Sequence, residues 1–161
     1  NGRAGAVDTR EFAAALNALC VRMAELLARD GEGATKLLRV RVEGGASDSD
    51  AQRVAKSVVE SPLIKTMAFG ADPNVGRILM AIGKCVDCRI EPTRVSARVQ
   101  GVEVIRGGVR ADFPEAEVRK LLDRDPLDIS IDLGLGAGRG LGLGCDLTEG
   151  YIRENAAYSS S

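Results

Sequence analysis

The sequence predicts an α+β fold in which helices pack on mixed sheets, and three observations support this. Apolar residues over 9–29 recur at spacings of three and four, which indicates an amphipathic helix. Residues 37–43 alternate between apolar and charged side chains, as a half-buried strand does, with Leu38, Val40 and Val42 on one face. Further helices and strands follow without a long linker. We therefore expect one domain, or two small lobes of about 1–85 and 86–161 that share a core.

The remaining elements can be predicted from capping and turn residues. Thr9 is expected to cap the first helix, and Ser47 with Asp50 to begin a second one. Pro114 is expected to open a helix over 114–122. Residues 148–158 are expected to be helical or extended. The other expected elements are a strand or an extended segment at 61–69, a short helix at 78–83, strands at 93–99 and 102–105 joined as a hairpin at Gly101, and strands at 127–133 and 140–147 joined by a flexible glycine hairpin.

Composition excludes several classes of function. The 161 residues carry a net charge of −1 without a basic stripe, so we expect no nucleic-acid partner. No segment approaches the roughly 18 apolar residues of a membrane span, so we expect no membrane contact. The sequence contains 0 histidines, which removes the commonest general base and the commonest metal ligand. Its 4 cysteines, in a charged chain with few loops, predict reduced thiols and a cytoplasmic location.

Two motifs resemble cofactor sites but lack the partners that such sites need. Cys85 and Cys88 have the spacing of zinc and redox sites, but a zinc site needs two more ligands, and Cys20 and Cys145 are distant in sequence. The glycine run 134–144 lacks the strand–loop–helix order of a phosphate loop. We therefore expect structural cysteines, no metal and no cofactor.

The loop 30–36 (DGEGATK) is the most distinctive local feature. Its two glycines allow a close approach of the backbone to a ligand, and its carboxylate and amine could hold the opposite charges of an amino-acid zwitterion. The alternative is a glycine-capped helix end with solvated charges. The segment 70–77 (GADPNVGR) leaves a similar choice. Asp72 is expected to cap a helix begun by Pro73, whose N-terminus either binds an α-carboxylate or is simply capped.

Four segments in this order resemble the ornithine acetyltransferases, also called glutamate N-acetyltransferases. They are DGEGATKL at 30–37, SPLIKT at 61–66, GADPNVGRILMAIGK at 70–84 and GCDLTEGYIRENAAY at 144–158. The resemblance extends over essentially the whole chain and favours ligand roles for both loops. It implies that the chain is the C-terminal part of the beta chain, the larger product of a precursor that cleaves itself before a threonine. Self-cleavage of this kind resembles that of N-terminal-nucleophile enzymes.

The resemblance also implies an acetyl transfer in arginine biosynthesis. The new N-terminal threonine would take acetyl from N2-acetylornithine and pass it to glutamate through an acetyl-threonine intermediate. Acetyl-CoA serves some members as a donor. An N-terminal threonine can use its own α-amine as base, which suits a chain without histidine. The implied partner is the N-terminal alpha chain of the same precursor, in a heterotetramer of two alpha and two beta chains.

The family's substrate contacts match three positions here, which are Glu32, Asn155 and Ser160, the last standing where threonine is usual. Val75 stands where tryptophan is usual, which is expected to loosen packing. No catalytic residue matches, because the nucleophilic threonine lies upstream. Thr66 lies in a sequence like that of the cleavage site, but its flanks match a later motif, so we expect a buried or site-adjacent residue.

Three expectations follow for the chain on its own. Residues 1–8 continue from an earlier segment, the chain alone is inert, and an apolar patch is exposed where the missing segments dock. Two alternatives stay open: a non-catalytic amino-acid-binding module, and a paralogue in secondary metabolism with another acyl acceptor. An upstream threonine preceded by a small residue would separate the enzyme from the module. The paralogue shares the chemistry, so the sequence pattern does not separate it.

Overall fold

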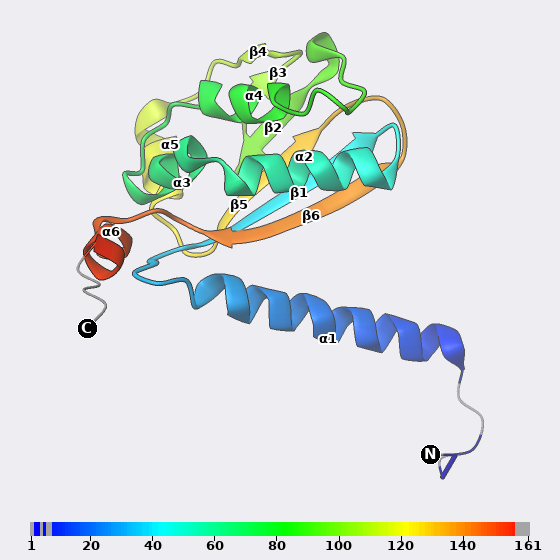
Figure 1. The fold of residues 1–161 in the computed structure, drawn as a ribbon. Helices are drawn as coiled ribbons and strands as arrows, with labels where there is room; N and C mark the ends of the chain where they lie inside the picture. Colours follow the sequence, from blue (N-terminus) through cyan, green and yellow to red (C-terminus); the bar gives the residue numbers. More distant parts are fainter. Residues whose placement is uncertain (1, 4, 6–7, 157–161) are drawn as a thin grey trace.

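The computed structural model describes residues 2–3, 5 and 8–156 and contains a six-stranded mixed sheet with helices packed against it (Figure 1). The strands lie in the order β4-β3-β2-β5-β1-β6. β1 runs parallel to β5 and antiparallel to β6, and β2 is antiparallel to both β3 and β5. This arrangement confirms the α+β class. The strands are β1 Leu37–Gly45, β2 Ser96–Val99, β3 Val102–Arg106, β4 Val109–Arg110, β5 Leu127–Asp132 and β6 Gly138–Cys145.

The helices lie on both sides of this sheet. In Figure 1, α2 lies over β1 and β6 with α3 and α4 beside it, whereas α1 runs along the opposite side. None of the helices in the described part of the chain is long and apolar enough to cross a membrane. The helices are α1 Thr9–Arg29, α2 Asp48–Glu60, α3 Pro62–Phe69, α4 Gly76–Gly83, α5 Glu115–Leu122 and α6 Glu149–Ala156, with a short 3-10 turn at Pro92–Arg94.

The hydrophobic core lies between the sheet and the layer of α2, α3 and α4. The predicted alternation of β1 is confirmed, because Leu38, Val40 and Val42 are almost fully buried while Arg41 and Glu43 are exposed. β5 alternates in the same way and faces the same side. The core is aliphatic, as the scarcity of aromatic residues requires, and its largest members include Leu38, Ile64, Met67, Ile78, Ile105, Leu122, Leu127, Ile129, Ile131 and Leu133.

The glycines of β6 allow α2 to pack directly on this strand. A Cβ atom added to Gly140 would lie 2.5 Å from the backbone of Ala51, and one added to Gly142 would lie 2.6 Å from the carbonyl oxygen of Ala55. Gly144 meets Val59 in the same way, at 2.8 Å. The alternate glycines therefore leave room for Ala51, Ala55 and Val59 of α2. Close packing of α2 on β6 therefore explains why the sequence of this strand is rich in glycine.

The expected hairpin between 127–133 and 140–147 is wrong. β1 lies between β5 and β6, so these two strands are not neighbours. The connection crosses the end of β1, where Leu135 N and Gly136 N donate to Gly44 O at 2.7 and 3.0 Å. The other expected hairpin is confirmed, because β2 and β3 are joined at Gln100 and Gly101, with φ angles of 50° and 86°.

Two predicted helices are confirmed, with one change of cap. α1 covers the predicted range, but its N-cap is Asp8, whose side chain accepts from Arg10 N at 2.8 Å, and not Thr9. α2 begins as predicted, because the Ser47 side chain accepts from Asp50 N at 3.1 Å. α6 settles the choice for the described part of 148–158 in favour of a helix.

The expected strand at 61–69 is also wrong, because this segment forms α3. Pro62 occupies the first helical turn, where its missing N–H is not needed. Ile64, Met67 and Ala68 are buried at helical spacing. A short apolar run followed by a turn can belong to either type of element, and here packing against α2 selects the helix.

The predicted short helix at 78–83 is confirmed as α4, which starts two residues earlier, whereas the expected helix start at Pro73 is wrong. α4 starts at Gly76 after Val75, so Asp72 does not cap it. Asp72 instead forms an ion pair with Arg77 at 3.1 Å. Val75, where we expected looser packing, is 2% exposed and belongs to the core.

Candidate functional site

The loop 30–36 is held in place by the carboxylate of Asp146, which follows β6 and is 3% exposed. Oδ1 of Asp146 accepts from Thr35 N at 2.8 Å and from Lys36 N at 3.0 Å, and Oδ2 accepts from the Thr35 hydroxyl. Three donors satisfy a carboxylate that would otherwise be costly to bury. Asp146 therefore joins the end of the loop to the segment that leads into α6.

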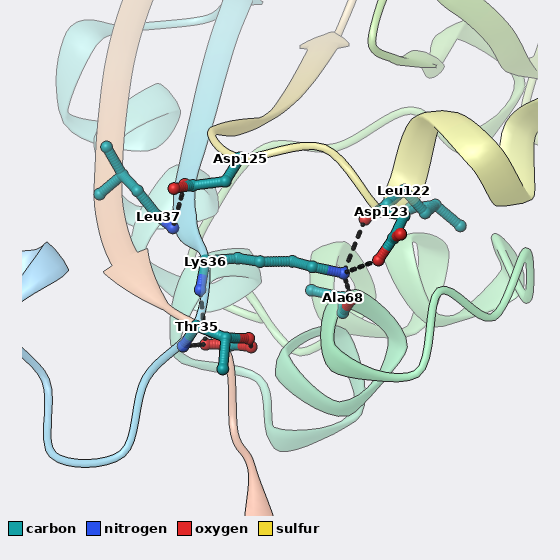
Figure 2. Close-up of polar contacts among 8 residues, drawn as sticks. Thr35, Lys36, Leu37, Ala68, Leu122, Asp123 and Asp125 are labelled. Carbon is teal, nitrogen blue, oxygen red and sulfur yellow. Dashed lines mark hydrogen bonds and ion pairs between the residues drawn. The ribbon is translucent and has the colours of Figure 1, made fainter.

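The amine of Lys36 points into the protein (Figure 2). Its Nζ donates to Ala68 O at 2.9 Å and Leu122 O at 3.2 Å, and it pairs with Asp123 Oδ1 at 3.1 Å. Both carbonyls belong to the last turns of helices, which attract a cation. The expectation that this amine neutralises a ligand carboxyl group is therefore wrong, because the amine stabilises the ends of α3 and α5 instead.

Asp125 fixes the start of β1 and the end of α1 together. Its Oδ1 accepts from Leu37 N at 3.0 Å, as Figure 2 shows, and its Oδ2 forms an ion pair with Arg29. Burial by itself would raise the pKa of Asp125, but the hydrogen bonds from Arg29 and Leu37 N outweigh it and hold this pKa below its usual value. The ion pair also raises the pKa of Arg29. The loop 30–36 is thus anchored at both ends.

Two of the predicted site residues meet on the surface beside this loop. Nδ2 of Asn155, on α6, donates to Glu32 Oε2 at 2.8 Å and to Tyr151 O at 2.9 Å. Both neighbours are acceptors, so the amide nitrogen must face them and Oδ1 of Asn155 points elsewhere. The pair therefore offers acceptor atoms, Glu32 Oε1 and Asn155 Oδ1, and a negative charge. Such a group of atoms suits an ammonium or amide N–H donor.

Other predicted residues have different environments. Ser160 lies outside the described residues. Thr66 is exposed, not buried, and its hydroxyl donates to Pro62 O within α3 at 3.0 Å. All four cysteines are free thiols, and burial raises the pKa of Cys88, with the neighbouring Cys85 adding to the effect. No group of three or more potential metal-ligating side chains occurs within the described part of the chain.

Sequence reasoning missed Asp146 and the internal role of Lys36. A carboxylate directly after a glycine-rich strand and three residues before a helix was the available signal for Asp146. Its partners Thr35 and Lys36 lie about 110 positions earlier, so local spacing did not reveal them. For Lys36, the deciding acceptors are carbonyls of helices whose positions depend on the whole fold.

Fold and site together define an α+β protein that presents the paired side chains of Glu32 and Asn155 on its surface. Comparison with known proteins gives its family. The ArgJ family model matches residues 1–160, and the chain belongs to this family.

Similar proteins include the Arginine biosynthesis bifunctional protein ArgJ 2 of Nostoc, with 44% identity over 161 residues, and the Glutamate N-acetyltransferase Oat2 of Streptomyces clavuligerus, with 46% over 165 residues. Each alignment covers 99% of this chain but only 41% and 42%, respectively, of the relative. The chain thus spans about two fifths of the length of these curated relatives.

A crystal structure of the Arginine biosynthesis bifunctional protein ArgJ of Bacillus halodurans shares the fold, with a TM-score of 0.90 and 41% identity. This match covers 95% of the present chain and 72% of that one.

Proposed function

We propose that this chain is the C-terminal part of the beta chain of a cytoplasmic enzyme that transfers acetyl from N2-acetylornithine to glutamate in arginine biosynthesis. The acetyl group would pass through a threonine upstream of this sequence, at the beta-chain N-terminus created by self-cleavage. Acetyl-CoA would be a second donor. Within this chain, Glu32, Asn155 and Ser160 are the substrate-binding residues, and none is the nucleophile. Family membership and the contact between Glu32 and Asn155 support the proposal.

The contact assigns a chemical task to each residue. Oε2 of Glu32 already accepts from Asn155, so we assign Oε1 to the ammonium group of the amino-acid substrate. Both hydrogens of Asn155 Nδ2 are directed at protein acceptors, so we assign its Oδ1 to a substrate N–H. Binding of the non-reacting part of a substrate in a fixed place aligns its acyl group with a nucleophile.

The exposed face of α1 supports a larger assembly. Six large apolar side chains lie along it, with exposed fractions from 47% at Leu16 to 75% at Leu27; the others are Phe12, Leu19, Met23 and Leu26. α1 is nevertheless fixed in direction by Glu25, which accepts from Arg39 Nε at 2.8 Å and whose pKa this hydrogen bond lowers, and by the ion pair of Arg29. An apolar helix face of this size is typical of an obligate interface.

We infer that this face of α1 binds the remainder of the precursor, comprising the upstream beta-chain segment and the alpha chain, within an α2β2 heterotetramer. Leu19→Glu, in the middle of the apolar face, should reduce co-purification of the remainder with this chain. Asn17→Glu, which adds the same charge beside that face, is the control and should co-purify normally. Equal recovery for the two variants would contradict the interface.

The test of the proposed function is an acetyl-transfer assay with the complete gene product and N2-acetylornithine and glutamate. Intact mass should show two chains, with a threonine at the start of the larger one. Without glutamate, that chain should retain one acetyl group. Residues 1–161 alone should be inert. An uncleaved product that binds the amino acids without transfer would favour the non-catalytic module.

A further inference from the structure

Thr148 links the loop of Glu32 to the helix of Asn155 through a single hydroxyl. This residue immediately precedes α6 and is 4% exposed. Its Oγ1 donates to Gly33 O at 2.6 Å and accepts from Tyr151 N at 3.1 Å. The second bond satisfies a free N–H of the first turn, as an N-cap does. One side chain therefore caps α6 and holds the loop against that cap.

The two backbones are in direct contact around this hydroxyl. A Cβ atom added to Gly33, whose φ is +64°, would lie 2.4 Å from Tyr151 N. Gly150 faces the same contact, because a Cβ there would lie 3.3 Å from the Cα of Gly33. Glycine at both positions lets the loop and the helix approach closely. The Thr148 hydroxyl adds a hydrogen bond between the loop and the start of α6 at this contact.

The geometry points to Thr148 as a positioning residue that sets the distance between Glu32 and Asn155; this inference rests on the proposed function of those two residues. Glu32 is the neighbour of Gly33, so the first hydrogen bond of Thr148 places its backbone. Asn155 lies seven residues after Thr148, which is about 10 Å along a helix. A small tilt of α6 at its cap is therefore amplified at Asn155, and substrate affinity should respond.

The test uses steady-state kinetics of the complete gene product with N2-acetylornithine and glutamate. Thr148→Val keeps the shape and removes both hydrogen bonds, whereas Thr148→Ser keeps the hydroxyl. Asn155→Ala, alone and combined with Thr148→Val, completes a double-mutant cycle. Ser57→Ala is the matched control, because the Ser57 hydroxyl donates to Ala81 O at 2.7 Å and ties α2 to α4 in another part of the fold.

We expect Thr148→Val to raise the KM for N2-acetylornithine about tenfold, with a smaller change in kcat, and Thr148→Ser to restore it. In the Asn155→Ala background, Thr148→Val should add less than about twofold, because the residue it positions is already absent. Ser57→Ala should lower the melting temperature without changing KM. Equal effects of Thr148→Val in both backgrounds, or an unchanged KM, would overturn the role of Thr148 alone. A wild-type protein without acetyl transfer would overturn the proposed function and this role with it.

Discussion

Asn155 Nδ2 and Glu32 Oε2 form a hydrogen bond of 2.8 Å between residues that are 123 positions apart in the sequence. Asn155 is on the exposed side of α6, and Glu32 is in the loop that precedes β1. Hydrogen bonds fix both segments: Asp146 accepts from the loop, and Thr148 caps the helix. A pair that is exposed but firmly supported is what a binding site on a rigid scaffold requires.

Asn155→Asp should test the electrostatics of this contact. A second carboxylate would face Glu32 at hydrogen-bond distance, and two like charges so close oppose each other. We expect kcat/KM of the complete gene product to fall by about tenfold or more at pH 8. Asn17→Asp, on exposed α1, is the control, and an equal loss in this variant or no loss at position 155 would contradict the prediction.

Lys36→Met should destabilise the fold. The substitution leaves the carbonyls of Ala68 and Leu122 without their buried donor, and we expect the free energy of unfolding to fall by about 2–4 kcal/mol. Lys56→Met removes only an exposed pair with Glu60 at 3.7 Å and should change it by less than about 0.5 kcal/mol. Urea unfolding measures both values. Similar stabilities for the two variants would show that the Lys36 contacts contribute little.

Asp125 should make stability depend on acid pH. Its pKa is lower in the folded chain than in the unfolded one, so the folded state binds fewer protons. The stabilisation from Asp125 is therefore complete above the unfolded pKa, about 3.9, and is lost as the pH falls through the lower folded value. Asp125→Asn should flatten the pH dependence of the unfolding free energy below about pH 4. Arg29→Met should flatten it in part. Parallel curves for wild type and Asp125→Asn would refute this assignment.

The cysteines should differ in reactivity in the native chain. Cys20 is exposed on α1, whereas burial raises the pKa of the Cys88 thiol and so lowers its thiolate fraction. We expect iodoacetamide to modify Cys20 well before Cys88 at neutral pH, and urea to reduce the difference. Mass spectrometry of the alkylated peptides measures the order. Faster modification of Cys88 would mean that its environment is more open than the structure shows.

Hydrophobic periodicity and capping residues predicted the elements that local sequence patterns determine. The range of α1, the buried face of β1 and the start of α2 follow from patterns within a few residues. Segment 61–69 was misassigned, because a short apolar run fits either a strand or a helix. The burial of Ile64 and Met67 in the core selects the helix. The hairpin at 127–147 was wrong because β1, which is distant in sequence, inserts between its two strands.

The candidate site was predictable only in part. The motifs at 30–37 and 144–158 indicated Glu32 and Asn155 through the resemblance, but no spacing rule placed them together. The supports of the site were not predicted. Asp146 and Lys36 are polar residues whose partners are set by the tertiary fold. Their side chains are only 3% and 8% exposed, which the sequence pattern does not indicate. The hydrogen-bond partners of buried polar side chains depend on how the elements pack, and hydrophobic periodicity does not predict them.

The KM for N2-acetylornithine of Glu32→Gln, measured in the complete gene product, tests the central claim most directly. Glutamine keeps the size and an acceptor oxygen but removes the charge that we assign to the substrate ammonium. Loss of a charge-assisted hydrogen bond predicts a rise in KM of about 10- to 100-fold, with the melting temperature unchanged. A KM equal to that of wild type would contradict the claim that Glu32 and Asn155 hold the amino-acid part of the substrate.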